Sequence, residues 1–113
     1  MNLNLAIIAG RATADPSLRS TPAGESVASF SLATNKSWTD KKGQKKEEVE
    51  FHNIVVWGRL ADVAGKLVRK GSTVLVQGAI ETRHWEDKQG QARKTTEIIA
   101  EKLQFLTLKE ENA

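Results

Sequence analysis

The chain has 113 residues, which is enough for one domain with a hydrophobic core and too few for two. Its 17 Lys and Arg residues slightly outnumber its 14 Asp and Glu residues, a balance that suits a polyanionic partner and equally describes many ordinary soluble proteins. Cysteine is absent, which excludes disulfides and thiolate ligands, and no stretch resembles an export signal or the roughly 18 apolar residues of a membrane span. We therefore expect a cytoplasmic protein without a membrane segment.

The first half of the sequence predicts three strands. Residues 3–10 are mostly apolar and stop at a polar stretch with two prolines, which predicts a strand followed by a loop. Residues 27–35 alternate with the period of two that is typical of a half-buried strand. The lysine-rich residues 37–46 are typical of a solvated hairpin tip, and residues 49–57, rich in β-branched and aromatic side chains, predict a long third strand.

The second half predicts one helix and then two or three strands. Residues 60–68 place apolar side chains at helical spacing. Residues 72–80 read as a strand, residues 83–95 as a second polar hairpin, and residues 97–100 and 103–108 as further strand segments, with no internal repeat.

This order of elements predicts an all-β fold with one short helix. It is the order of a five-stranded Greek-key OB-fold barrel, here with two protruding hairpins, although other small barrels share it. The open face and loops of such barrels commonly bind oligonucleotides or oligosaccharides. We expect one domain over residues 1–108, followed by a short C-terminal end over residues 109–113.

No catalytic or metal-binding pattern stands out. His52 and His84 lie far apart in the sequence, and a histidine in an apolar-rich strand is commonly a hydrogen-bonded structural group. The acidic residues are scattered or lie in solvated turns, and there is no Gly-rich phosphate loop or nucleophile motif. We therefore expect no catalytic residue, no metal and no cofactor, while paired carboxylates that meet in the fold leave an enzyme as the last alternative.

The tryptophans lie in or beside the expected surface segments. Trp38 opens the lysine-rich stretch, and Trp85 lies in the second hairpin. An exposed ring beside flexible cations is costly in water unless something covers it, and unpaired bases do so, because each stacked base contributes about 1 to 3 kcal/mol. A tryptophan in a small domain is also commonly a core or interface anchor, and for Trp57 both interpretations stay open. Phe30 and Phe105 are assigned to the core.

Three segments resemble the bacterial single-stranded DNA-binding proteins, in the same order and with similar spacing. They are DPSLRSTPAGESVASFSLATNKSW, EFHNIVVWGRLADVAGKLVRKGSTVLVQG and TRHWEDKQGQARKTTEIIA, and together they cover nearly all of the chain. The resemblance implies a non-catalytic OB-fold subunit that assembles as a homotetramer and is wrapped by single-stranded DNA. It implies stacking positions at Trp38, Phe51, Trp57 and Trp85 and a contact between subunits at His52.

Basic residues near these rings are expected to contact phosphates. They are Lys36, Lys41, Lys42, Lys45, Lys46, Arg59, Arg83, Lys88 and Arg93. The expected function is sequence-tolerant binding and protection of single-stranded DNA in replication, recombination and repair. Members of the family usually continue into a tail with an acidic tip that recruits other genome-maintenance proteins, whereas this sequence ends in KEENA, so we do not expect recruitment through a tail.

Three alternatives stay open at this point. The first is another OB-fold binding module, either a replication-restart accessory, which is usually a dimer, or an RNA-binding protein. The second is a protein-interaction adaptor whose tryptophans form a subunit interface. The third is an enzyme such as a nuclease. Oligomeric state and a comparison of single-stranded DNA, duplex and RNA, with and without divalent metal, distinguish them.

Overall fold

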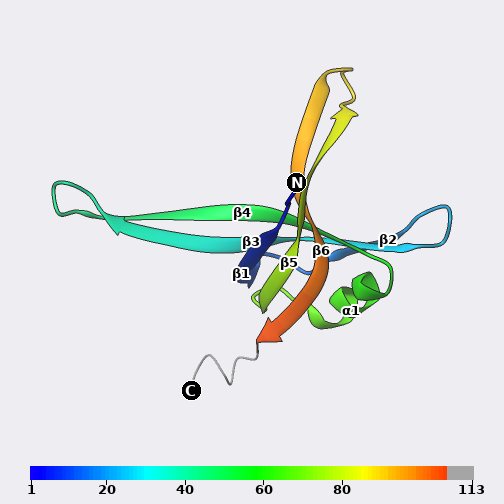
Figure 1. The fold of residues 1–113 in the computed structure, drawn as a ribbon, viewed down its shortest axis with the longest axis horizontal. Helices are drawn as coiled ribbons and strands as arrows, with labels where there is room; N and C mark the ends of the chain where they lie inside the picture. Colours follow the sequence, from blue (N-terminus) through cyan, green and yellow to red (C-terminus); the bar gives the residue numbers. More distant parts are fainter. Residues whose placement is uncertain (107–113) are drawn as a thin grey trace.

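The computed structural model describes residues 1–106, which form a barrel with two long hairpins projecting from it in different directions (Figure 1). The elements are β1 (Ala6–Ala12), β2 (Ser17–Ser20), β3 (Ser26–Thr39), β4 (Lys45–Trp57), α1 (Arg59–Leu67), β5 (Thr73–Glu86) and β6 (Ala92–Leu106). The expected C-terminal end, residues 109–113, and the last two residues of the expected domain lie outside the described residues.

A single sheet closes on itself to make the barrel. Its strand order is β1-β5-β6-β4-β3-β2, and β1 also pairs with β3, so five strands form a closed ring to which β2 adds only at β3. Every pairing is antiparallel except that of β4 with β6, which runs through Ile54–Ile98 and Val55–Ile99. The structure confirms the expected fold class, an all-β five-stranded OB-fold barrel with one short helix and protruding hairpins.

The core fills the barrel with alternate residues of the strands. The largest fully buried side chains are Leu32, Ile54, Val56, Val68, Val74 and Val76. Phe30 is buried among them and Phe105 packs against them partly buried, as expected for both. Helix α1 covers part of the barrel through Ala61 and Ala64, whose small side chains let the helix approach closely. Removal of this apolar surface from water is the main stabilising contribution to such a fold.

Both hairpins are paired as strands further out than the sequence predicts. Residues 37–46 were expected as a solvated tip, but β3 and β4 pair through them as far as Thr39 and Lys45. The expected polar hairpin, residues 83–95, is likewise strand except for its turn at residues 87–91. A two-stranded ribbon continues its backbone hydrogen bonds without any buried face, so polar composition does not end the strands.

Smaller differences concern the bounds of other strands. β1 begins at Ala6, and the expected loop contains β2, a four-residue strand held by β3 and by the packing of Leu18 beside the helix. β6 is one continuous strand rather than two segments, with a bulge opposite residues 77 and 78. Gly78 is required there, because a side chain would collide with the backbone carbonyl of Ile99.

Candidate nucleic-acid interface

The end of the first hairpin, residues 36–48, is called here the β3–β4 tip, and it holds an exposed ring among cations. Trp38 is 42% exposed, and the Lys36 ammonium lies 5.5 Å from the centroid of its ring. Asp40 closes the turn, because its Oδ1 accepts the backbone N–H groups of Lys42 and Gln44 at 2.9 and 2.8 Å. The exposed lysines of this tip form no ion pair within residues 1–106, and they are Lys36, Lys41, Lys42, Lys45 and Lys46.

The end of the second hairpin, residues 83–95, is called the β5–β6 tip and repeats this arrangement. Trp85 is 41% exposed, and the guanidinium carbon of Arg83 lies 5.9 Å from the centroid of its ring. Asp87 closes the turn, because its Oδ1 accepts the backbone N–H groups two and four residues further on, both at 2.9 Å. Both tips therefore present a tryptophan beside a cation, on a turn closed by an aspartate.

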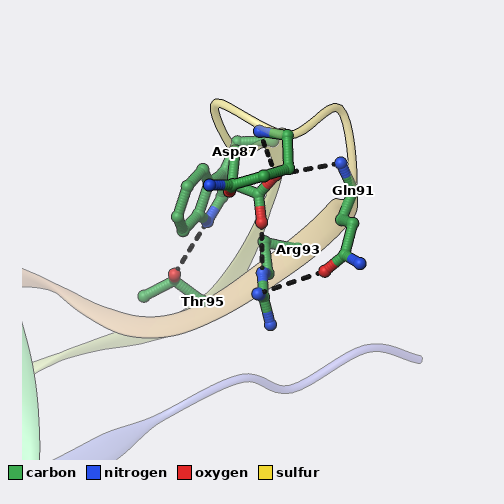
Figure 2. A network of polar contacts seen from close by, with 6 residues as sticks. Asp87, Gln91, Arg93 and Thr95 are labelled. Carbon is green, nitrogen blue, oxygen red and sulfur yellow. Dashed lines mark hydrogen bonds and ion pairs between the residues drawn. The ribbon is translucent and has the colours of Figure 1, made fainter.

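At the β5–β6 tip, side chains form a network of hydrogen bonds with the turn (Figure 2). Arg93 donates from Nε to Oδ2 of Asp87 at 2.9 Å and from Nη2 to Oε1 of Gln91 at 3.3 Å. Nearby, the Nε1–H of Trp85 donates to Oγ1 of Thr95 at 3.0 Å. The hydrogen bond from the Gln91 backbone, together with the bond from Arg93, holds the pKa of the Asp87 carboxyl below its ordinary value.

Trp57 lies on a groove of about 450 Å³ between β4 and the base of the second hairpin. This ring is 44% exposed, so it does not belong to the barrel core. Arg83 and Glu97 line the same groove and form an ion pair at 3.5 Å, and Arg19 of β2 lines its edge. The Arg83 side chain is 54% exposed and that of Glu97 is 14% exposed, so the guanidinium stays accessible to a phosphate while Glu97 holds it from the groove side.

Phe51 is the most exposed of the four rings, at 63%. It lies beside a largely apolar groove of about 360 Å³ that also includes Ile8, Ile80 and His52. His52 is half-buried, and its Nε2 lies 2.8 Å from Oγ1 of Thr34. The structure thus places His52 in a hydrogen-bonded position at the rim of an apolar surface.

The four rings occupy both faces of the sheet. Trp38 lies directly opposite Lys46 in the β3–β4 pair, so these two side chains are on the same face of the sheet. Because side chains alternate along β4, Lys46 lies on the opposite face from Phe51 and Trp57. The parallel pairing of Val55 with Ile99 carries the face of Trp57 onto β6, and the same alternation along β6 puts Trp85 on that face. Phe51, Trp57 and Trp85 therefore share one face. A nucleic-acid chain that also contacts Trp38 must pass around the β3–β4 ribbon.

The remaining expected cations are exposed but less closely joined to a ring. Arg59 begins α1, two residues after Trp57, and Lys88 lies in the turn of the second hairpin. Among residues 1–106, no group of three or more His, Asp or Glu side chains is placed to hold a metal ion. In the same part of the chain, no helix has the length and apolar character to cross a membrane.

Sequence reasoning did not single out Arg19, Asp87 or Thr95. Arg19 was hidden in a segment read as loop, because a four-residue strand is too short for its alternation to be recognised. The sequence did contain a pattern that points to Asp87, because the similar heptapeptides WTDKKGQ and WEDKQGQ occupy the two tips and share this aspartate. The chain therefore does contain a short internal repeat. Thr95 had no signal, because its contact with Trp85 depends on cross-strand register.

Comparison with known proteins gives consistent matches over the barrel and both tips. The model of the Single-strand binding protein family matches residues 3–106. The structure of a Plasmodium falciparum SSB complex with ssDNA is 37% identical, with a TM-score of 0.87 over 95% of this chain and 97% of that chain. A deletion mutant of the single-stranded DNA binding protein from Thermus aquaticus is 32% identical, with a TM-score of 0.82. That match covers 93% of this chain and 51% of the Thermus chain, so this chain spans about half its length.

Proposed function

The chain belongs to the single-strand binding protein family, and from this we propose that it binds and protects single-stranded DNA in replication, recombination and repair. The observation that carries the proposal is that all four expected rings are 41 to 63% exposed on a surface supplied with cations. Every base has a flat face, so stacking on these rings is sequence-tolerant. The family is a non-catalytic DNA-binding family, and we infer that this chain also performs no turnover.

Stacking is assigned to Trp38, Phe51, Trp57 and Trp85. The DNA path that fits their positions follows the face that holds three of the rings and then turns around the β3–β4 ribbon to Trp38. Wrapping around a subunit follows naturally from this placement, because a strand lying flat on one face meets only part of the stacking surface.

Phosphate contacts are assigned to the basic residues of the two tips and the groove between them. The unpaired lysines of the β3–β4 tip supply most of the free positive charge. Arg83 and Arg93 are each held by a carboxylate, so they contribute less net charge until DNA displaces Glu97 or Asp87. Arg19 joins this set because it lines the same groove as Trp57.

The assembly expected for this chain is a homotetramer. The proposal is supported by the exposed apolar side chains Leu3, Leu5 and Ile7 near the N-terminus. One edge of β1 pairs with β3 only at Arg11 and Ala12, which leaves backbone groups available for a second copy. His52 lies beside an apolar groove that suits a contact between subunits. We place residues 1–108 in the DNA-binding domain and the protein in the cytoplasm.

The decisive experiment is a titration of the purified chain with a single-stranded oligonucleotide, its duplex and the matching RNA, each with and without divalent metal. Tight binding to single-stranded DNA alone, without cleavage, is expected. Preference for RNA supports the RNA-binding alternative, and loss of substrate only with metal supports a nuclease.

Light scattering should give a tetramer, whereas a stable monomer contradicts that assembly and a dimer favours the replication-restart accessory.

A further inference from the structure

The two hairpin tips are equivalent in sequence and register. Each contains the same heptapeptide pattern, and in each the tryptophan lies two residues before the aspartate that closes the turn. The register pairs Trp38 with Lys46 and Trp85 with Arg93. Every position of one tip therefore has a counterpart in the other, so the two tips can be compared residue by residue.

The principal difference is what holds the indole. Thr95 accepts a hydrogen bond from Nε1 of Trp85 at 3.0 Å, across the ribbon. Its counterpart at the β3–β4 tip is Glu48, because Thr95 pairs with Arg83 as Glu48 pairs with Lys36. Within residues 1–106, the indole of Trp38 donates no hydrogen bond, and its contact is the Lys36 ammonium above the ring.

The turn beneath the two rings differs as well. At the β5–β6 tip, Asp87 binds Arg93, and Arg93 also binds Gln91, so the strand opposite Trp85 is tied to the turn by side chains (Figure 2). At the β3–β4 tip, Asp40 accepts backbone N–H groups alone, and Lys46, the counterpart of Arg93, forms no ion pair within the described residues.

A ring held in one orientation is a better stacking surface than a mobile one. Fixing a side chain with several rotamers costs free energy at the moment of binding, and a ring already fixed avoids that cost. Arg83 lies over one face of the Trp85 indole, so a base that stacks on this ring without displacing Arg83 would use the opposite face. The hydrogen bond from Nε1 uses the edge of the ring and does not block that face.

We propose that Thr95 is a positioning residue that fixes the Trp85 indole for stacking before DNA arrives, so that the Trp85 ring is preformed and the Trp38 ring becomes fixed only on binding. This inference rests on the proposed binding of single-stranded DNA. It assigns different behaviour to two tips that carry the same turn, and the difference comes from the residue opposite the cation, Thr95 in one tip and Glu48 in the other.

The first test uses the free protein and is independent of DNA. Hydrogen exchange of the three indole N–H groups is followed by NMR in the chain labelled at tryptophan nitrogen, with Trp85→Phe to assign the signal. The Trp85 indole is expected to exchange more slowly than that of Trp38. Thr95→Val should remove the protection and Thr95→Ser should keep it. Equal exchange of Trp85 and Trp38 in the parent chain overturns the proposal without any variant.

The second test is a titration with a single-stranded oligonucleotide. Thr95→Val should weaken binding roughly fivefold with an unchanged salt slope, while Thr95→Ser binds like the parent. Thr39→Val makes the same chemical change beside Trp38, where the threonine side chain forms no hydrogen bond within residues 1–106, and should have little effect. Circular dichroism confirms folding of each variant.

The two proposals fail in different ways. A parent chain that does not bind the oligonucleotide contradicts the proposed function. A parent that binds, together with a folded Thr95→Val variant that binds equally well, contradicts the positioning role of Thr95 alone. A Thr39→Val variant weakened as much as Thr95→Val also contradicts it, because the effect would then not depend on the hydrogen bond to Trp85.

Discussion

At the scale of single residues, the interface combines rings and cations whose contributions are separable. Stacking of a neutral ring on a base displaces no counterion, whereas each phosphate contact releases cations and makes binding sensitive to salt. Trp38 and Trp85 are close to equally exposed, and each lies under a cation. The lysines of the β3–β4 tip form no ion pair within residues 1–106, whereas Arg83 is held by Glu97.

Replacing a stacking ring should weaken binding without changing its response to salt. Trp38→Ala and Trp85→Ala are each expected to lose about 1 to 3 kcal/mol of binding free energy, because one stacked base is lost in each case. The log-log salt slope should stay close to that of the parent. Fluorescence anisotropy of a labelled single-stranded oligonucleotide at several salt concentrations measures both quantities. Folded variants that bind like the parent would remove these rings from the interface.

Replacing a free lysine should instead flatten the salt slope. For single strands the slope is about −0.7 per neutralised phosphate, so Lys45→Ala should reduce its magnitude by about that amount if Lys45 makes one contact. Arg83→Ala should change it less, because Glu97 already balances part of the guanidinium charge. The same anisotropy series measures both variants. A change for Arg83 as large as that for Lys45 would mean that DNA fully displaces Glu97 from the guanidinium.

At the scale of elements, each hairpin is a two-stranded ribbon closed by the same turn. The turns need a glycine at one position, because Gly43 and Gly90 have φ angles of 81° and 77°, which other residues rarely adopt. Asp40 and Asp87 bind the backbone of their turns in the same way, but only Asp87 is also bound to a side chain from the opposite strand among the described residues. The second turn is therefore the more constrained of the two.

The order of the second turn should depend on acid pH. The pKa of Asp87 is lowered by the backbone bond from Gln91, with further bonds from Arg93 and Gln89. The stabilisation is therefore fully present above the ordinary aspartate pKa of about 3.9 and is lost as pH falls through the lower pKa of the folded state. NMR titration of the Gln91 amide should report this step. Asp87→Asn should abolish it, and a Gln91 amide that titrates unchanged in that variant would assign the step to another group.

At the scale of the whole molecule, the barrel places the two hairpins relative to one another. The parallel β4–β6 pair joins one strand of each hairpin. Trp57, at the end of β4, therefore shares a groove with the base of the β5–β6 hairpin. The hairpins then leave the barrel in different directions (Figure 1). Closure of the barrel also depends on close backbone contacts at glycines within the strands. The tightest of these is between Gly78 of β5 and the backbone of β6.

A side chain at Gly78 should destabilise the entire fold. Gly78→Ala places a methyl group against the carbonyl of Ile99, and overpacking of this kind typically costs about 1 to 3 kcal/mol of unfolding free energy. Gly24→Ala is the control, because its added carbon meets no atom within 4 Å and it incurs only the strain of a positive φ, about 1 kcal/mol. Chemical denaturation compares the two. Equal stability would mean that the bulge beside Gly78 relaxes without loss.

The sequence by itself determined the five barrel strands by their alternation and composition, although not the short β2, the single helix by its spacing, and the pairing of tryptophans with cations by their proximity in the chain. It also indicated the binding class, because exposed rings beside cations, the combination suited to unpaired nucleic acid, lie in the hairpins. Each of these features can be predicted because it depends only on the periodicity and composition of one segment of the chain. The family resemblance added the assignment of Phe51 and Trp57.

Only the tertiary structure decided how those residues meet. Trp38 lies on the opposite face from Trp57 because the register of β3 with β4 fixes which alternate positions coincide. Arg19 reaches the groove because β2 pairs with β3, and Thr95 reaches the Trp85 indole across ten positions of sequence. Register and strand order come from closing the barrel with segments far apart in the chain, and a pattern within one segment carries no information about which residue will lie opposite it.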